Sequence, residues 1–144
     1  MSRTRIDTLR RLAPFSGCSD KELRRLDSLL DQAEVPAGKQ LTAVGQHGTQ
    51  AFVIVEGAAE ARIGERHLAS FGPGDVIGEM ALLDRRASRV ATVVTTAPTT
   101  VLVMDPRSFE SVMAQFPSVA RHIATVLAQR LRLADTAPAS ELAG

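Results

Sequence analysis

Aromatic side chains are scarce in this sequence, which has five phenylalanines and neither tryptophan nor tyrosine among its 144 residues. A protein that holds single-stranded nucleic acid by base stacking needs exposed aromatic rings. The composition therefore argues against such a surface. Packing is left to aliphatic side chains, and the hydrophobic fraction of 44% is that of an ordinary globular protein.

The sequence also has almost no excess of charge of either sign. The net charge is +1, and the basic residues are spread along the chain. Binding to a phosphate backbone requires a clustered basic footprint. We therefore expect no nucleic-acid partner.

The sequence has one cysteine and no long apolar run. The single cysteine, Cys18, excludes an intrachain disulfide and is predicted to be a small buried or half-buried filler. No apolar run approaches the length of a membrane span, and the first residues, MSRTRIDTLRR, lack the apolar stretch of a signal peptide. These absences predict a cytoplasmic protein with no membrane partner.

Helical patterns are present at both ends of the chain, whose length suits one domain. Near the N-terminus, residues 2–12 show helical spacing, and a capping box of Ser19 and Glu22 begins a second helix that fades near residue 31. Further on, an Asp-Pro pair at 105–106 starts another helix, and Pro117 starts the longest one.

The middle of the chain has a different texture, in which glycine-containing turns separate short β-prone runs. Those runs read LTAV, AFVIV, AEARI, RHLASF, VATVVTT and TTVLVM. Short strands at close intervals predict an antiparallel sandwich or jelly roll. The stretch GEMALL, residues 78–83, interrupts this pattern with a helical composition of one or two turns.

The interruption has the chemistry of an anion site. A short helix offers the unpaired amides of its first turn, here those of Met80 and Ala81, and Gly78 lets a ligand come close. The guanidinium of Arg89 would complete a phosphate clamp. Beside a phosphate, Glu79 needs a hydroxyl donor. A ribose cyclic phosphate would satisfy both groups.

These residues resemble the cyclic nucleotide-binding domain family, over about residues 12–133. The matching segments are FSGCSDKELRRL, EVPAGKQL, AFVIVEGAAEA, FGPGDVIGEMALLD, SRVATVV and DPRSFESVM, and the most specific is the phosphate-binding cassette GEMALLDRRASRVATV. The resemblance implies a mainly β fold, an antiparallel jelly roll with N-terminal helices, a short phosphate-binding helix and C-terminal helices. It implies a domain over residues 1–135 followed by a flexible tail over 136–144.

The resemblance also implies a role for each ligand-binding position. Glu79 would accept a hydrogen bond from the ribose 2′-hydroxyl, Gly78 would permit close approach, the amides of Met80 and Ala81 would bind the cyclic phosphate, and Arg89 would pair with that phosphate. The residues expected around the nucleoside and base are Val76, Val90 and Ala91, with Leu127 and Arg130 of the last helix over the base.

Two departures from the family pattern bear on the ligand. The position after the cassette arginine is commonly Ala, Ser or Thr, and here it is Val90, which offers no hydroxyl to guanine and so favours cyclic AMP over cyclic GMP. Its extra bulk also keeps open an alternative, a degenerate fold that binds no ligand and serves as a docking or oligomerisation module. The loop before Arg89 also departs from the common pattern, so Arg86 is a second candidate; the ATV that follows favours Arg89.

An enzyme is not expected from this sequence. The three histidines, His47, His67 and His122, are isolated, so they predict no metal site, and Cys18 has no histidine nearby to activate it. After the long helix only about a dozen residues remain, too few for a helix-turn-helix domain. We therefore expect a stand-alone sensor whose C-terminal helices relay binding to a partner protein or to a second copy, without a cofactor.

Overall fold

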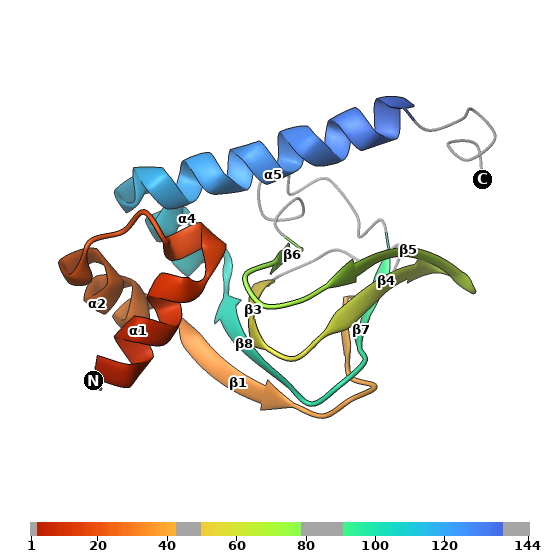
Figure 1. Cartoon of the computed structure of the whole chain (residues 1–144), viewed down its shortest axis with the longest axis horizontal. Helices are drawn as coiled ribbons and strands as arrows, with labels where there is room; N and C mark the ends of the chain where they lie inside the picture. Colours follow the sequence, from red (N-terminus) through yellow and green to blue (C-terminus); the bar gives the residue numbers. More distant parts are fainter. Residues whose placement is uncertain (1–2, 43–49, 79–90, 137–144) are drawn as a thin grey trace.

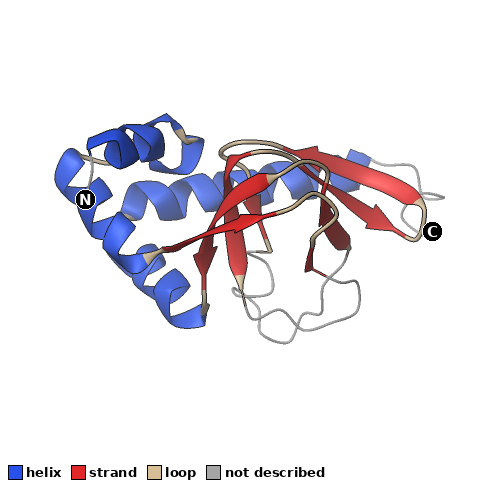
Figure 2. Ribbon diagram, turned by 90° about the horizontal axis from the view of Figure 1, so that it is seen from below, coloured by secondary structure: helices blue, strands red, loops and turns tan. Residues whose placement is uncertain are grey.

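The fold is a layer of helices set against a sandwich of two β-sheets (Figures 1 and 2). The computed structural model describes residues 3–42, 50–78 and 91–136. The helical elements are α1 (Arg3–Arg11), the 3-10 turn η1 (Ala13–Phe15), α2 (Asp20–Leu29), α4 (Pro106–Gln115) and α5 (Pro117–Thr136). In Figure 1, α1, α2 and α4 gather at one end, and α5 runs along the sandwich.

The strands pair as two antiparallel four-stranded sheets within the described residues. The first sheet has the order β1-β8-β3-β6 and the second the order β2-β7-β4-β5. Their bounds are β1 Asp31–Val35, β2 Gln40–Thr42, β3 Ala51–Glu56, β4 Ala59–Ile63, β5 Arg66–Phe71, β6 Val76–Ile77, β7 Thr92–Thr95 and β8 Thr99–Met104. The predicted antiparallel jelly roll with flanking helices is confirmed.

Two strands were not predicted from the sequence. β1 is an edge strand in which no residue is fully buried, so it lacks the strong apolar alternation that marks a half-buried strand. It is held by pairing with β8, from Asp31 opposite Val103 to Val35 opposite Thr99. β6 has two residues, too few for any periodicity to show.

Both faces of strand β3 are covered by apolar clusters. Ala51 and Val53 point to a buried cluster that includes the helices, and Phe52 and Ile54 point to a second cluster between the sheets. Side chains alternate across a strand, so a continuous apolar run is required when both faces are covered. This is why AFVIV carries no polar residue.

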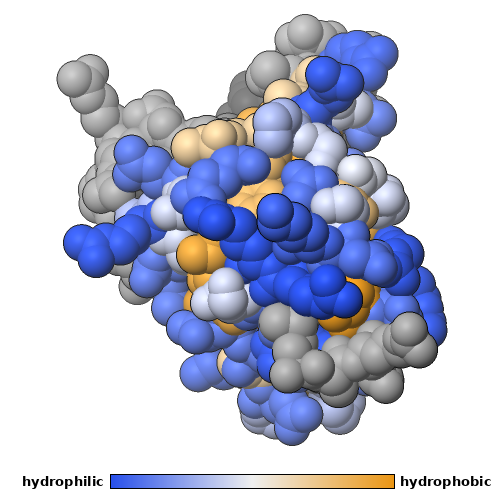
Figure 3. Space-filling view, turned by 90° about the vertical axis from the view of Figure 1, so that its left-hand side faces the viewer, coloured by the Kyte–Doolittle hydropathy of each residue, from blue (hydrophilic) through white to orange (hydrophobic). Residues whose placement is uncertain are grey.

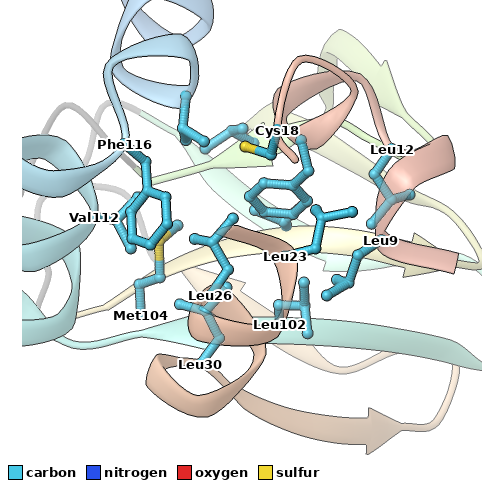
Figure 4. Close-up of a cluster of buried hydrophobic side chains, with 14 of the residues drawn as sticks. Leu9, Leu12, Cys18, Leu23, Leu26, Leu30, Leu102, Met104, Val112 and Phe116 are labelled. Carbon is cyan, nitrogen blue, oxygen red and sulfur yellow. The ribbon is translucent and has the colours of Figure 1, made fainter. Parts of the chain in front are cut away.

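The helical core is mainly aliphatic and contains three phenylalanines, Phe15, Phe109 and Phe116. Figure 4 shows side chains from α1, α2, α4 and β8 converging on one another. Phe15 and Phe116 are each 1% exposed, and Leu23 and Leu26 of α2 are fully buried. Cys18 belongs to this cluster at 8% exposure, with its Sγ 3.5 Å from Ser118 Oγ, and burial raises the pKa of its thiol. The prediction of a buried filler is confirmed.

The helix starts predicted from capping residues are confirmed. The Ser19 hydroxyl accepts from the Glu22 amide at 3.2 Å, and the Glu22 carboxylate accepts from the Ser19 amide at 2.9 Å. At α4, Asp105 Oδ1 accepts from the Ser108 amide at 2.7 Å, with Pro106 in the first turn. That hydrogen bond from the Ser108 amide lowers the pKa of Asp105.

The surface at the helical end of the molecule is mainly polar. Figure 3 looks onto this end and shows hydrophilic residues over most of it, with smaller apolar areas between them. Ion pairs support this surface, including Arg10 with Asp7 and Arg5 with Asp27. Among the described helices, none is both long enough and apolar enough to cross a membrane.

Candidate functional site

The candidate site lies where the chain passes from one sheet to the other. β6 is an edge strand of the first sheet, and β7 is an inner strand of the second. Residues 79–90, which carry Glu79, Met80, Ala81, Arg89 and Val90, lie outside the described residues. The structure describes the residues on either side of this segment, up to Gly78 and from Ala91 onward.

The two ends of the cassette are anchored in one apolar cluster. Ile77, at the end of β6, is 2% exposed, and Ala91, just before β7, is 7% exposed. Both belong to the cluster between the sheets. Moving either side chain out of the cluster is unfavourable, because its apolar surface would be exposed to water. The segment between them is thus tethered at two fixed points.

Thr42 fixes the start of β7 from the neighbouring strand. Its hydroxyl donates to the Ala91 carbonyl at 3.0 Å and accepts from the Val93 amide at 3.2 Å. The side chain is buried at 7% exposure, so both bonds are shielded from water. Sequence reasoning missed this residue, since a threonine in a β-prone run carries no signal of such a bridge.

Gly78 has a conformational reason to be glycine as well as a steric one. Its φ is +83°, in the left-handed region that favours glycine. The sequence reasoning assigned Gly78 for ligand approach alone. The structure adds that the chain must turn sharply here, directly after β6.

The turn before β6 is held against the N-terminal helices. The amide of Gly72 donates to Asp75 Oδ2 at 2.7 Å, and the amide of Gly74 donates to the Ile54 carbonyl at 2.8 Å. A Cβ on Gly74, whose φ is +89°, would come within 3.2 Å of the Ala13 nitrogen in η1. This turn is therefore in close backbone contact with the helical layer.

The long helix α5 contacts the same strand. Val76 is 3% exposed and belongs to the helical cluster, against which the half-buried Leu127 also packs. Arg130, one turn further along α5, donates from its Nη2 to the Val76 carbonyl at 3.0 Å. The structure thus brings Val76 and Arg130 into direct contact. Leu127 packs against the helical cluster that includes Val76, and Gly78 follows Val76 by two residues in the sequence.

Titratable residues do not form a metal centre in the part of the chain that the structure describes. No group of three or more His, Cys, Asp or Glu side chains gathers there in a way that could hold an ion. His67 is exposed and lies 2.9 Å from Ser70 Oγ through its Nε2, while His122 is half-buried on α5. His47 lies outside the described residues.

Comparison with known proteins places this architecture in a family. The model of the cyclic nucleotide-binding domain matches residues 32–116. The chain belongs to the cyclic nucleotide-binding domain family. The matched range contains the whole cassette and all the described strand residues except Asp31 of β1, so the predicted resemblance is confirmed.

Relatives of this cyclic nucleotide-binding domain serve different systems. It is 34% identical over 107 residues to the Pycsar effector protein XpPycTIR of Xanthomonas perforans, covering 74% of this chain and 35% of that protein. It is 32% identical over 126 residues to the Cyclic AMP receptor protein of Thermus thermophilus, covering 84% of this chain and 58% of that protein.

A solved structure from Thermus thermophilus, that of its catabolite activator protein, shares the fold. Sequence identity is 31% and the TM-score is 0.76, with 85% of this chain and 60% of that chain covered. The chain spans about a third of the length of XpPycTIR and about three fifths of the length of the Cyclic AMP receptor protein. The domain is therefore a regulatory, cyclic nucleotide-binding unit of the kind found within larger proteins.

Proposed function

We propose that this domain is a cyclic nucleotide sensor that prefers cyclic AMP and relays binding through its C-terminal helices. The observation that carries the proposal is the complete cassette, Gly78 through Val93, which follows β6 directly and runs into the first residues of β7 in the family fold. A cassette that had lost its ligand would be free to lose Gly78, Glu79 or Arg89. All three are present.

The proposed binding uses two anchors on one rigid ligand. The amides of Met80 and Ala81 and the guanidinium of Arg89 hold the cyclic phosphate, and Glu79 accepts from the ribose 2′-hydroxyl. Preorganised donors around an oxyanion are strong when water is excluded. A ligand must carry both a phosphate and a free hydroxyl to satisfy both anchors.

The preference for cyclic AMP rests on Val90. This position follows the arginine and has no hydroxyl with which to bind a guanine edge. The relative from Thermus thermophilus is a cyclic AMP receptor, which supports the same ligand. Val76 and Ala91 line the nucleoside in this proposal; Val76 lies two residues before the cassette and Ala91 lies within it, and both side chains are buried.

The output of the proposed sensor is mechanical. α5 contacts β6 directly, so a ligand that changes the position of β6 changes the position of α5 as well. Such coupling is limited by the difference in ligand affinity between the two arrangements. We assign the signal to a protein partner or to a second copy, with no DNA contact and no catalytic step of the domain's own.

A second candidate function is favoured by the bulk of Val90. In that alternative the side chain fills the pocket, and the domain docks or oligomerises without a ligand. A thermal-shift panel of cyclic and linear nucleotides separates the two. The sensor is stabilised by cyclic AMP and not by 5′-AMP, whereas a docking module responds to neither; a response to divalent metal would instead support an enzyme.

Replacing Glu79 with glutamine tests the ribose anchor. The amide cannot serve as a charged acceptor, and a hydrogen bond to a charged group contributes roughly 1.5–3 kcal/mol. We expect cyclic AMP to bind at least about tenfold more weakly. Titration calorimetry with 2′-deoxy cyclic AMP is the control, because the variant, which keeps only a neutral acceptor, should lose part of its discrimination against that analogue. Equal discrimination by parent and variant would remove Glu79 from the site.

A further inference from the structure

The Val76 carbonyl lies on the open edge of the first sheet. Among the strands that the structure describes, β6 pairs only with β3, through Val53 opposite Val76 and Phe52 opposite Ile77. The Asp75 carbonyl accepts from the Ile54 amide at 3.0 Å, so it faces β3. Successive carbonyls of a strand point to opposite sides. The carbonyl of Val76 therefore faces away from β3, where no described strand continues the ladder.

Arg130 supplies the donor for this edge carbonyl. Its guanidinium is partly buried, and the bond of 3.0 Å joins residues 54 positions apart in the sequence. A buried main-chain carbonyl without a partner is unfavourable, and a charged donor gives a stronger hydrogen bond than a neutral one. The bond thus helps to fix the outer edge of this two-residue strand.

We propose that Arg130 is a positioning residue that holds β6, and with it Gly78, for ligand binding through the Val76 carbonyl. The resemblance alone placed Arg130 over the base of the nucleotide. The geometry points instead to the protein's own backbone, two residues before the cassette. Arg130 then makes the position of α5 and the occupancy of the site depend on each other, and that dependence is reciprocal.

The two roles of Arg130 predict different selectivity. A side chain that covers the base contributes according to which base is present. A side chain that holds β6 contributes equally to every cyclic nucleotide, since all share the ribose cyclic phosphate. We therefore expect Arg130→Ala to weaken cyclic AMP, cyclic GMP and cyclic CMP by a common factor of about ten.

The matched control is Arg132→Ala. Arg132 lies two residues further along α5 and is exposed, so its removal changes the net charge equally without touching β6. Arg130→Lys is a second variant that keeps the charge and a single point donor. It should recover part of the lost affinity, which a loss through misfolding would not.

Hydrogen exchange of the ligand-free protein tests the contact without any ligand. In Arg130→Ala, exchange should rise about tenfold in peptides that cover β6 and the second half of α5, because a strong local bond is lost. Arg132→Ala should leave both peptides unchanged. Unchanged exchange in Arg130→Ala would overturn the inference.

The affinity measurements rest on the proposed function, whereas the hydrogen-exchange measurement does not. The two experiments can therefore fail separately. If the parent chain binds no cyclic nucleotide but exchange responds as expected, the proposed function fails while Arg130 still positions β6. If the parent chain binds and Arg130→Ala loses affinity for purine nucleotides alone, Arg130 contacts the base and the inference is wrong. A uniform loss together with faster exchange supports it.

Discussion

An Arg89→Ala variant is expected to bind cyclic AMP about thirtyfold more weakly, or worse, than the parent chain. A buried phosphate that loses its guanidinium partner costs roughly 2–5 kcal/mol, because the charge is left without compensation in a site that excludes water. Titration calorimetry gives the two affinities directly. The effect should fall on every cyclic nucleotide, since all carry the same phosphate.

Arg86→Ala is the matched control for that experiment. It removes the same charge three positions earlier in the sequence. A surface charge that does not touch the ligand contributes little, about 0–1 kcal/mol. Should Arg86→Ala abolish binding while Arg89→Ala leaves it intact, the cassette arginine has been assigned to the wrong position.

A Phe116→Ala variant is expected to lose about 3–5 kcal/mol of unfolding free energy. Phe116 is 1% exposed and ends α4, where its amide donates to the Val112 carbonyl at 3.0 Å. Its ring lies beside Val112 and Met104 in the helical core (Figure 4). Removing it leaves a cavity where α4 meets α5. Since small domains are stable by roughly 5–15 kcal/mol, urea should unfold the variant at a much lower concentration.

The control for this core variant is Leu68→Ala. Leu68 is 43% exposed on β5, so its truncation should change the unfolding free energy by no more than about 0.5 kcal/mol. Equal effects from the two truncations would mean that the packing around Phe116 is not what stabilises the helical layer.

Local chemistry made some elements predictable from sequence. The capping box of Ser19 and Glu22 and the Asp105 cap announce helices because the side chain bonds within its own turn. Strands buried on one or both faces, such as AEARI and AFVIV, are predicted by their apolar residues. The cassette was readable for the same reason, since its residues act within one short stretch.

Contacts between distant residues were not predictable. The bond from Arg130 to the Val76 carbonyl depends on how α5 crosses β6, and the bridge made by Thr42 depends on β2 lying beside β7. β1 was missed because pairing with β8, rather than its own pattern, makes it a strand. The roles of Glu79 and Arg89 remain predictions from the sequence and the family.

The most direct test of the account is a crystal structure of the domain with cyclic AMP. We predict that the cyclic phosphate lies within hydrogen-bonding distance of the Arg89 guanidinium and the amides of Met80 and Ala81, with the ribose 2′-hydroxyl on Glu79. Electron density for the nucleotide elsewhere, with Arg89 in solvent and protein side chains filling the space beside Gly78, would contradict it.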